Sequence, residues 1–375
     1  MLEFESISIY VLTWSTAYLA VMADIPHHMR AVVRTKAGDP EVLQLRHDYP
    51  TPKPKKDHIL IRVRCIGLNR AELRSRAGDP PAKGEFTSDE LFTEDPPQIL
   101  GEECVGTVAD NGGVSSFSVG DIVATWFCGI GKVFDGAYAE YTLAPAAYCY
   151  KIETKLSIDV LGAIPATFIT AWGSLHRALH IQKGDTVLVH GGTSSVGTAA
   201  IILAKRAGRH VAATTRQQSK VDQLKKTGAD VVLIDNSDKL LAEQLKQHSA
   251  FQKGAQWVLE LVGPDKITEA FTCTAAFGTV CVTGVLTKVW KLDDWSPANG
   301  SIESGKKITT YQNPRDDDHE GIGKALSEIV KAVEEGEIDV DQFVGKRLKG
   351  LENVAEGHRL MEKSDVQGKV VVQVS

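Results

Sequence analysis

Short runs in which apolar and polar residues alternate, separated by glycine and proline, make up the chain from Met29 to about Ile152. In the run 59–65 the apolar residues alternate with Arg62 and Arg64, which places both arginines on one face of a strand. Such alternation is typical of an antiparallel sheet with one face in water. We therefore expect a strand-rich first domain, with further strands starting near residues 31, 104 and 121.

The pattern changes in the middle of the chain, where an apolar helical stretch at 163–179 precedes strands that alternate with helices. The strands are expected at 186–190, 210–214, 231–235, 257–260 and 278–284, and the helices at 198–207, 220–226 and 267–275. Short apolar strands that alternate with helices imply right-handed crossovers and a parallel sheet covered on both faces. The predicted fold class is α/β, with a doubly wound (Rossmann) domain at 157–312.

The C-terminal part predicts a loop at 315–320, an amphipathic helix at 322–333 and a last strand that begins at Lys369. The simplest placement returns residues 313–375 to the first domain, 29–156, which makes that domain discontinuous. Residues 1–28 differ from the rest, because the uncharged run 7–22 is too short to predict a spanning helix and is preceded by Glu3 and Glu5. We interpret 1–28 as a leader or a mis-called start outside the fold, with a membrane anchor as the alternative.

The charge balance and the cysteines limit the function classes. A formal net charge of −6 gives the chain no general attraction to nucleic acid, so we expect no nucleic-acid partner. The six cysteines are scattered and form no Cys-x-x-Cys pair, which indicates reduced, mostly buried thiols. A cytoplasmic location is therefore expected.

The segment 187–197 carries the strongest motif, because a buried strand runs directly into a glycine-rich turn and a helix. Against the G-x-G-x-x-G pattern it keeps Gly192 and Gly197 but has Ser194 in the middle position. Gly192 is expected to permit the tight turn and Gly197 the close contact between helix and strand. Ser194, Ser195 and Val196 then offer backbone amides and hydroxyls to a pyrophosphate at the helix N-terminus. An ordinary glycine turn is the alternative interpretation.

The end of the following strand decides between the two nicotinamide cofactors. NAD-binding domains place a carboxylate there for the ribose hydroxyl, but the segment 213–220 contains none. It carries Arg216 and Lys220 with the hydroxyls of Thr215 and Ser219, a cationic set that suits a 2′-phosphate. This favours NADPH, unless both basic residues are simply solvated at a helix start.

Five motifs occur in one order along the chain: Gly67–Gly78, Pro97–Val108, Val119–Val123, Asp135–Tyr141 and His190–Gly197. Together with the strand-rich first domain, they resemble the medium-chain dehydrogenase/reductase superfamily, and within it the zinc-free quinone oxidoreductase (zeta-crystallin-like) branch. The resemblance covers about residues 29–375. It implies a discontinuous GroES-like catalytic domain, a Rossmann domain, a substrate cleft between them, and a homodimer or homotetramer.

The same resemblance shows which metal ligands are missing. Zinc-dependent members carry a Cys where this chain has Asn69 and a His where it has Glu102. The remaining Glu103 and Cys104 do not supply the three protein ligands of a catalytic zinc ion. The structural zinc lobe needs four closely spaced cysteines, and only Cys128 lies between Cys104 and Cys149. We therefore expect no metal site for catalysis.

Without a metal, hydride addition to an already electron-poor carbon is easier than interconversion of alcohol and ketone. By resemblance, Asn69 lies near the nicotinamide and can donate to the developing oxyanion, and Thr167 matches the position that contacts the nicotinamide ribose. Gly284, Val285 and Leu286 match the segment along the carboxamide. The alternative roles are a turn residue for Asn69, a helix cap for Thr167 and core packing for Val285 and Leu286.

No general acid stands out. His176, His180 and His190 are the nearest candidates in sequence, but single histidines in such settings are more often core residues. Protonation by water is the default. Arg70 and Arg74, four residues apart, are expected on one helical face. Because the position of Arg74 often carries a substrate-touching aromatic in this family, the choice of acceptor stays open.

Three functions remain. The first is an NADPH-dependent reductase of a quinone, and the second is an enoyl reductase of a secondary-metabolite pathway that acts on an α,β-unsaturated carbonyl or thioester. The third is an NADPH-binding protein with little turnover.

Overall fold

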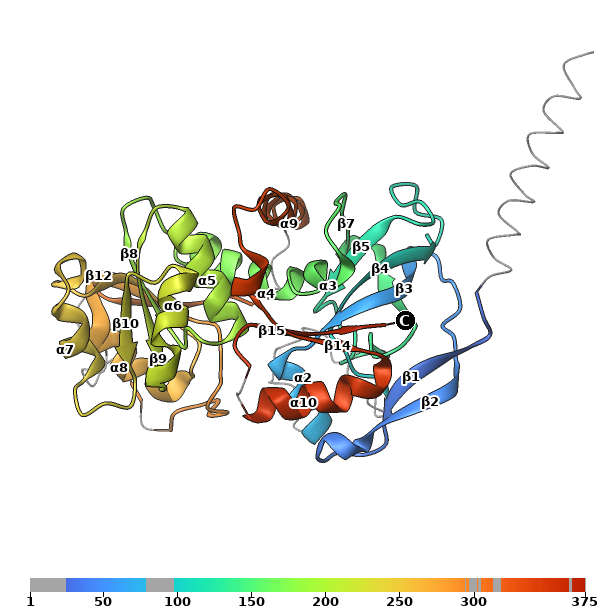
Figure 1. Cartoon of the computed structure of the whole chain (residues 1–375), viewed down its shortest axis with the longest axis horizontal. Helices are drawn as coiled ribbons and strands as arrows, with labels where there is room; N and C mark the ends of the chain where they lie inside the picture. Colours follow the sequence, from blue (N-terminus) through green and yellow to red (C-terminus); the bar gives the residue numbers. More distant parts are fainter. Residues whose placement is uncertain are drawn as a thin grey trace, which may run out of the picture. The chain divides into compact units, whose positions relative to one another are not determined.

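The computed structural model describes residues 25–78, 98–293, 295–296, 302, 305–312, 318–363 and 366–374. The chain divides into two compact units (Figure 1). Of the described residues, the strand-rich unit holds those up to Glu153, those of 348–359 and those from Val372 on, and the parallel-sheet unit holds those of 154–347 and 360–371. Most of the expected leader at 1–28 lies outside the described residues. The domain boundaries proposed above stay a prediction.

The first sheets are antiparallel along the N-terminal part of the chain, as the alternation predicts. β1 pairs with β2, and a seven-stranded sheet runs in the order β14-β15-β3-β4-β5-β7, with β6 paired to β3. The strands are β1 His28–Arg34, β2 Leu43–Pro50, β3 His58–Gly67, β4 Glu103–Asp110, β5 Ile122–Trp126, β6 Tyr141–Pro145, β7 Cys149–Lys151, β14 Val344–Lys349 and β15 Lys369–Gln373. The helices that accompany these strands are α2 Arg70–Ala77 and α10 Val354–Lys363.

The register of β3 follows from its side chains. Arg62 and Arg64 are exposed while Ile61 and Val63 between and beside them are buried, which confirms the predicted solvated face. β4 approaches β3 closely at Gly106, where a Cβ would lie 2.2 Å from the carbonyl oxygen of Arg62. Only glycine fits that position.

The second sheet is parallel throughout, in the order β10-β9-β8-β11-β12-β13. Its strands are β8 Thr186–His190, β9 His210–Thr215, β10 Val231–Ile234, β11 Ala255–Glu260, β12 Thr274–Val282 and β13 Lys307–Thr310. The order reverses between β8 and β11. Ligands of open α/β sheets bind at the carboxyl ends of the strands at such a reversal.

Helices cover this sheet as the alternation of strands and helices predicts. α5 packs on β8 and β9, α7 packs on β10, and α8 packs on β11 and β12. The helices are α3 Ile158–Leu161, α4 Pro165–Trp172, α5 Ser195–Arg206, α6 Val221–Thr227, α7 Leu241–Lys246, α8 Ile267–Cys273 and α9 His319–Glu334. The apolar core under α7 and α8 includes Leu188, Val258, Leu245 and Phe271.

Several element bounds differ from the prediction, among them those of the strand expected at 278–284, which runs from Thr274 to Val282. The helix expected at 267–275 ends at Cys273, because Thr274 already starts β12. The expected loop at 315–320 lies partly outside the described residues, and its last two residues begin α9, whose first turn is capped by the Asp318 carboxylate at 2.8 Å from the Gly321 amide. After Trp172 the predicted helix continues as a π-helix, η4 (Gly173–Ala178).

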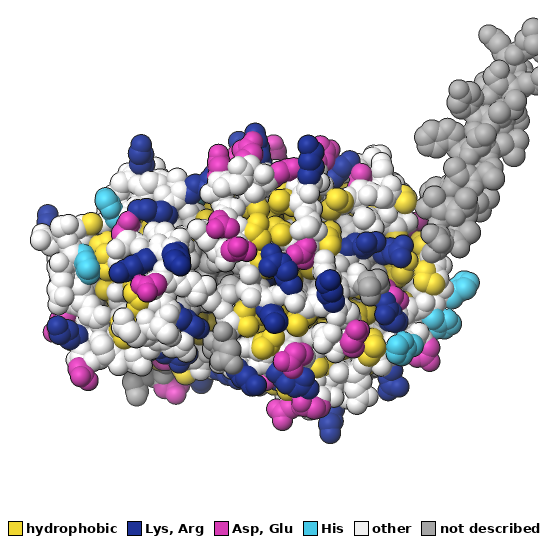
Figure 2. Space-filling view, viewed as in Figure 1, with side chains coloured by type: hydrophobic (Ala, Val, Ile, Leu, Met, Phe, Trp, Pro, Cys, Tyr) yellow, Lys and Arg dark blue, Asp and Glu magenta, His cyan; other side chains and the backbone are white. Residues whose placement is uncertain are grey.

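The most apolar helical stretch of the described residues belongs to the core. Ile158–Ala178, 21 residues long, is the one helix of the described residues that is long and apolar enough to cross a membrane. Its most apolar 18-residue window has a mean hydropathy of 1.4, and 78% of that window is buried. A Cβ at Gly173 would lie 1.9 Å from the Tyr311 ring, so the glycine lets this ring pack directly on the helix. The six cysteines are thiols, and all but the half-buried Cys128 are buried, as predicted. On the face in Figure 2, basic and acidic side chains are interspersed.

Candidate active site

The glycine turn lies where the order of the parallel strands reverses. Gly191 has φ +88°, so the left-handed turn residue is Gly191 and not, as predicted, Gly192. Gly192 instead allows close contact with β9, because a Cβ there would lie 2.9 Å from Ala213 Cβ. The Gly191 amide donates to Thr214 Oγ1 at 2.9 Å and the Gly192 amide to the Thr214 carbonyl at 3.1 Å, which fixes the turn on β9.

The start of α5 has the predicted close contact with the turn. A Cβ at Gly197 would lie 2.4 Å from the Gly191 carbonyl oxygen, so this position admits only glycine. Ser194 is the N-cap: its Oγ accepts from the Gly197 amide at 3.0 Å and donates to the Gly191 carbonyl at 2.8 Å. The Ser194 hydroxyl is therefore used by the fold. The amides of Ser195 and Val196, the first two of the helix, have no carbonyl partner within it and suit an anion.

A second turn borders the glycine turn. Thr283, Gly284, Val285 and Leu286 follow β12 and run beside Leu261, since a Cβ at Gly284 would lie 2.4 Å from the Leu261 carbonyl. Leu286 also borders Gly191, where an added Cβ would lie 3.5 Å from Leu286 Cδ1. Val285 and Leu286 are half-buried, which leaves part of each available to a ligand.

Thr167 lies in α4, two residues after Pro165 at the first helical position. Its side chain is 2% exposed, and its Oγ1 has no hydrogen-bond partner among the described residues. The helix cap considered for Thr167 is not observed, because the N-cap position is Ile164. A buried hydroxyl without a partner costs about 1–3 kcal/mol, so a bound ligand that engages it gains correspondingly.

The proposed 2′-phosphate pocket follows β9. Thr215 Oγ1 accepts from the Gln217 amide at 3.1 Å, which shapes the turn, and Arg216 and Ser219 are exposed while Lys220 is half-buried. Asp235, at the end of β10, donates its amide to the Thr215 carbonyl at 2.9 Å. The pKa of Asp235 is lowered mainly by His190 and also by the charges of Lys266 and Arg216. A carboxylate near Arg216 was not foreseen, because it comes from the next strand.

In the strand-rich unit, Asn69 is the N-cap of α2. Its side-chain amide donates to the Gly67 carbonyl at 3.1 Å and to Glu103 Oε2 at 3.2 Å, and its backbone amide donates to Glu72 Oε2 at 2.7 Å. Both amide hydrogens thus have partners in the chain, and donation to a substrate requires exchange of one of them. Arg70 and Arg74 lie four apart on α2, as expected.

The position of the missing zinc histidine is filled by an internal ion pair. Glu102 is 1% exposed, and its Oε2 lies 3.0 Å from Lys132 Nζ. Lys132 is itself mostly buried, with 12% of its side chain exposed. Sequence reasoning did not find Lys132, because nothing in its local pattern marks it.

A buried hydrogen-bond chain next to this pair was also missed. Glu72 accepts from the Glu102 amide at 2.7 Å and from Tyr138 Oη at 2.6 Å. Tyr138 Oη lies 2.8 Å from His358 Nε2, and Arg76 donates to His358 Nδ1 at 3.3 Å. Burial, and then the charge of Glu102, raise the pKa of Glu72 above its ordinary value.

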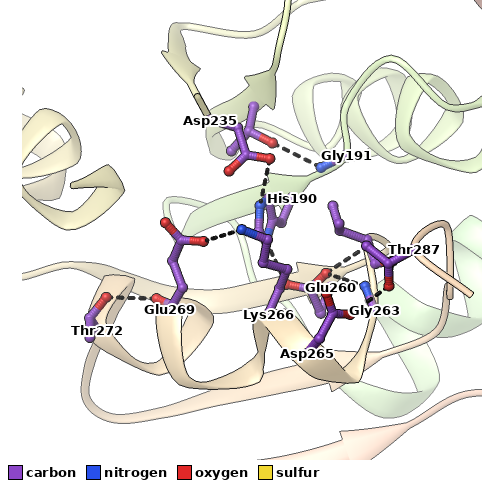
Figure 3. Close-up of polar contacts among 12 residues, drawn as sticks. His190, Gly191, Asp235, Glu260, Gly263, Asp265, Lys266, Glu269, Thr272 and Thr287 are labelled. Carbon is purple, nitrogen blue, oxygen red and sulfur yellow. Dashed lines mark hydrogen bonds and ion pairs between the residues drawn. The ribbon is translucent and has the colours of Figure 1, made fainter. Parts of the chain in front are cut away.

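A third cluster lies at the carboxyl edge of the parallel sheet (Figure 3). His190 closes β8, Asp235 follows β10 and Glu260 closes β11. His190 Nδ1 lies 2.6 Å from Glu260 Oε2. His190 is buried, as expected of a core histidine, whereas His176 is half-buried and His180 exposed. The predicted strand ends carry the signal for this cluster, since parallel strands present their last residues at one edge.

Within the parallel-sheet unit, the residues fit a nicotinamide dinucleotide. The glycine turn removes side chains from the strand reversal, the first amides of α5 suit a pyrophosphate, and Thr167 offers a buried hydroxyl without a partner.

Two family profiles match the chain. The profile "Alcohol dehydrogenase GroES-like domain" matches residues 55–154, and the profile "Zinc-binding dehydrogenase" matches residues 195–312. They cover parts of the strand-rich region and of the parallel-sheet region. This bears out the predicted fold class, an α/β Rossmann-like domain with a GroES-like strand-rich domain.

Known proteins of similar sequence and fold agree. A quinone oxidoreductase of Pongo abelii is 30% identical over 257 residues, which are 68% of this chain and 73% of that protein. The compactin diketide synthase mlcB of Penicillium citrinum is 26% identical over 85% of this chain and 12% of that protein. The structure of mycobacterial Rv1454c complexed with NADPH has a TM-score of 0.77 and 26% identity, over 92% of this chain and 99% of that one. The chain therefore belongs to the medium-chain dehydrogenase/reductase superfamily and is an NAD(P)-dependent oxidoreductase related to quinone oxidoreductases.

Proposed function

We propose that this protein is an NADPH-dependent reductase that transfers a hydride to a quinone without a metal ion at the reaction centre. The Glu102–Lys132 ion pair carries this proposal. A buried carboxylate that already holds an ammonium group 3.0 Å away is a poor ligand for a catalytic zinc ion. Asn69, at the position of the other missing ligand, has its amide hydrogens on Gly67 and Glu103.

The proposed acceptor class rests on this proposed absence of a metal ion at the reaction centre. A quinone or a conjugated carbonyl delocalises the arriving charge onto its own oxygen, so the protein needs mainly to position the partners, exclude water and donate a hydrogen bond. NADPH supplies the hydride when it is bound. Asn69 is the proposed donor to the oxyanion, and water supplies the final proton. Thr167, whose buried hydroxyl lacks a partner among the described residues, is the proposed contact to the nicotinamide ribose.

The cofactor preference rests on the segment after β9. Gly192, Gly197 and the first amides of α5 would hold the pyrophosphate, and Gly284, Val285 and Leu286 would border the nicotinamide. Thr215, Arg216, Ser219 and Lys220 would receive the 2′-phosphate, since an arginine binds phosphate oxygens through two parallel hydrogen bonds. The mycobacterial relative complexed with NADPH supports this preference.

The second candidate is an enoyl reductase that acts on an α,β-unsaturated carbonyl or thioester. The same scaffold and the same donors would serve it. Its specific support is the similarity to a segment of the Penicillium diketide synthase. An NADPH-binding protein with little turnover is the third candidate. For each of them we expect a homodimer or homotetramer and a cytoplasmic location.

Purified protein separates these candidates through NADPH oxidation followed at 340 nm. A simple ortho-quinone is compared with a conjugated enone and an enoyl thioester at equal concentration. We expect fastest turnover with the quinone, whereas faster turnover with the enoyl thioester selects the second candidate. Tight NADPH binding with no acceptor above background selects the third. Stoichiometric zinc that is lost on Glu102→Gln would contradict the metal-free mechanism.

A further inference from the structure

Three ligand-type side chains meet at the carboxyl edge of the parallel sheet, beside the glycine turn. One nitrogen of His190 and one carboxylate oxygen each of Asp235 and Glu269 lie within 4.8 Å of one another. Figure 3 shows that they come from three places, the ends of β8 and β10 and the helix α8. The sheet and its covering helix therefore converge on one point with groups that bind cations.

The imidazole of His190 is held in a fixed orientation. It is 1% exposed, and its Nδ1 lies 2.6 Å from Glu260 Oε2. The other oxygen of Glu260 accepts from the amides of Val262 at 2.6 Å and Gly263 at 3.1 Å, so both carboxylate oxygens have partners. A carboxylate that binds one ring nitrogen is the usual support of a metal-ligating histidine, because it turns the other nitrogen toward the ion.

The second ring nitrogen points into the cluster, where it has a long ion-pair contact with Asp235 but no hydrogen bond within the described part of the chain (Figure 3). His190 Nε2 lies 3.5 Å from Asp235 Oδ2, and in the described part of the chain it has no hydrogen-bond partner. Asp235 Oδ1, which is also buried, has none there either. Buried polar atoms without partners are rare in proteins and indicate a missing water, ion or ligand.

We propose that His190, Asp235 and Glu269 form a binding site for a divalent transition-metal cation of the zinc class. One imidazole nitrogen and two carboxylate oxygens, with water at the open position, are a ligand set that zinc accepts. The site is separate from Asn69 and Glu102, where zinc-dependent relatives carry ligands. Its ion takes no part in hydride transfer and ties the ends of β8, β10 and α8 together next to Gly191.

The ammonium group of Lys266 competes with a metal ion for the carboxylate of Glu269. Lys266 Nζ lies 3.2 Å from Glu269 Oε2, and the lysine side chain is 35% exposed. A partly exposed lysine can move its ammonium group into solvent when a metal ion binds. Removal of its charge should therefore strengthen metal binding, an effect opposite to the loss of a ligand.

The test uses the metal-stripped full-length protein. Zn²⁺ binding is measured by equilibrium dialysis, and Co²⁺ absorption in the visible range reports the ligands. We expect one ion per chain at this site and at least about tenfold weaker binding in Glu269→Gln. Glu243→Gln is the matched control, because Glu243 is an exposed helical glutamate of the same unit. It should leave the affinity unchanged.

Lys266→Ala should tighten Zn²⁺ binding several-fold, which a merely structural role of the cluster does not predict. Because Lys266 and Glu269 are both partly exposed, the two variants are expected to fold. Absence of Zn²⁺ binding, or an affinity that neither variant changes, would overturn the site. In that case His190 is a protonated imidazolium that pairs with the carboxylates of Asp235 and Glu260.

Discussion

The two units each bury a histidine, and the two rings differ in what faces them. His358 in the strand-rich unit has a partner at both nitrogens, Tyr138 and Arg76. His190 in the parallel-sheet unit has Glu260 at one nitrogen and an unsatisfied edge toward Asp235 at the other. The first network is closed, and the second is open on one side.

Neighbouring charges help to shift the pKa values of the two rings in opposite directions. Burial, and then the charge of Arg76, lower the pKa of His358 to about 3. Burial also lowers the pKa of His190, but the carboxylates of Asp235 and Glu260 outweigh it and raise this pKa to about 10. Burial alone therefore does not decide the charge of a histidine. The carboxylates around His190 attract a cation, and the arginine beside His358 repels one.

The largest effect is expected beside the closed network, where Lys132→Ala removes the lysine that pairs with the buried Glu102. The loss of one partner of a buried ion pair costs about 3–5 kcal/mol of unfolding free energy. Urea denaturation measures it. Lys151→Ala is the matched control, because Lys151 pairs with Asp121 at 3.1 Å while 42% exposed, and such pairs contribute about 1 kcal/mol or less. Equal losses in both variants would contradict a stabilising role of the buried Glu102–Lys132 ion pair.

Tyr138→Phe opens the same network without changing its charge. It deprives Glu72 of a donor 2.6 Å away and His358 of its partner at 2.8 Å. Because both buried groups lose a hydrogen-bond partner, the unfolding free energy should fall by about 2–3 kcal/mol in total. Tyr49→Phe is the control, since Tyr49 donates to Asp135 at 2.7 Å from a partly exposed position where water can replace the hydroxyl. Denaturation curves should show a clearly smaller loss for Tyr49→Phe.

The depressed pKa of His358 predicts acid sensitivity. In the folded protein this pKa is about 3, against an ordinary value of 6.5, so between these values the unfolded chain binds one more proton. The His358 contribution is therefore complete above pH 6.5 and is lost as the pH falls toward 3. The unfolding free energy should fall by about 1.4 kcal/mol per pH unit more in the wild type than in His358→Gln. Parallel profiles would mean that His358 has the same pKa in the folded and in the unfolded protein.

The smallest effect is expected on the open side. Asp235→Asn removes a carboxylate that lies 3.5 Å from His190 Nε2 without a hydrogen bond, while Glu260 stays in place. In metal-free protein we expect a smaller loss of unfolding free energy than in Tyr138→Phe, because Glu260 Oε2, 2.6 Å from Nδ1, still pairs with the charged ring. A loss as large as that of Tyr138→Phe would show that Asp235 is a full partner of His190 Nε2, which leaves no open position for a metal ion.

The sequence predicts what depends on local patterns. Period-two alternation found β3, and apolar strands that alternate with helices found the parallel sheet and its glycine turn. The positive φ at Gly191 instead of Gly192 was missed, because neighbouring glycines are equivalent in a pattern. Tyr138 and His358 are 220 positions apart, so no spacing rule joins them. Lys132 likewise meets Glu102 only through the fold.

The central claim is that the segment after β9 binds the 2′-phosphate of NADPH. The most direct test is the affinity for NADPH and for NADH, measured by fluorescence titration in the wild type and in Arg216→Ala, with the exposed Arg62→Ala as the charge control. Loss of a charge-assisted contact predicts about 1.5–3 kcal/mol weaker NADPH binding in Arg216→Ala and little change for NADH. Equal weakening of both cofactors, or of neither, would contradict the account.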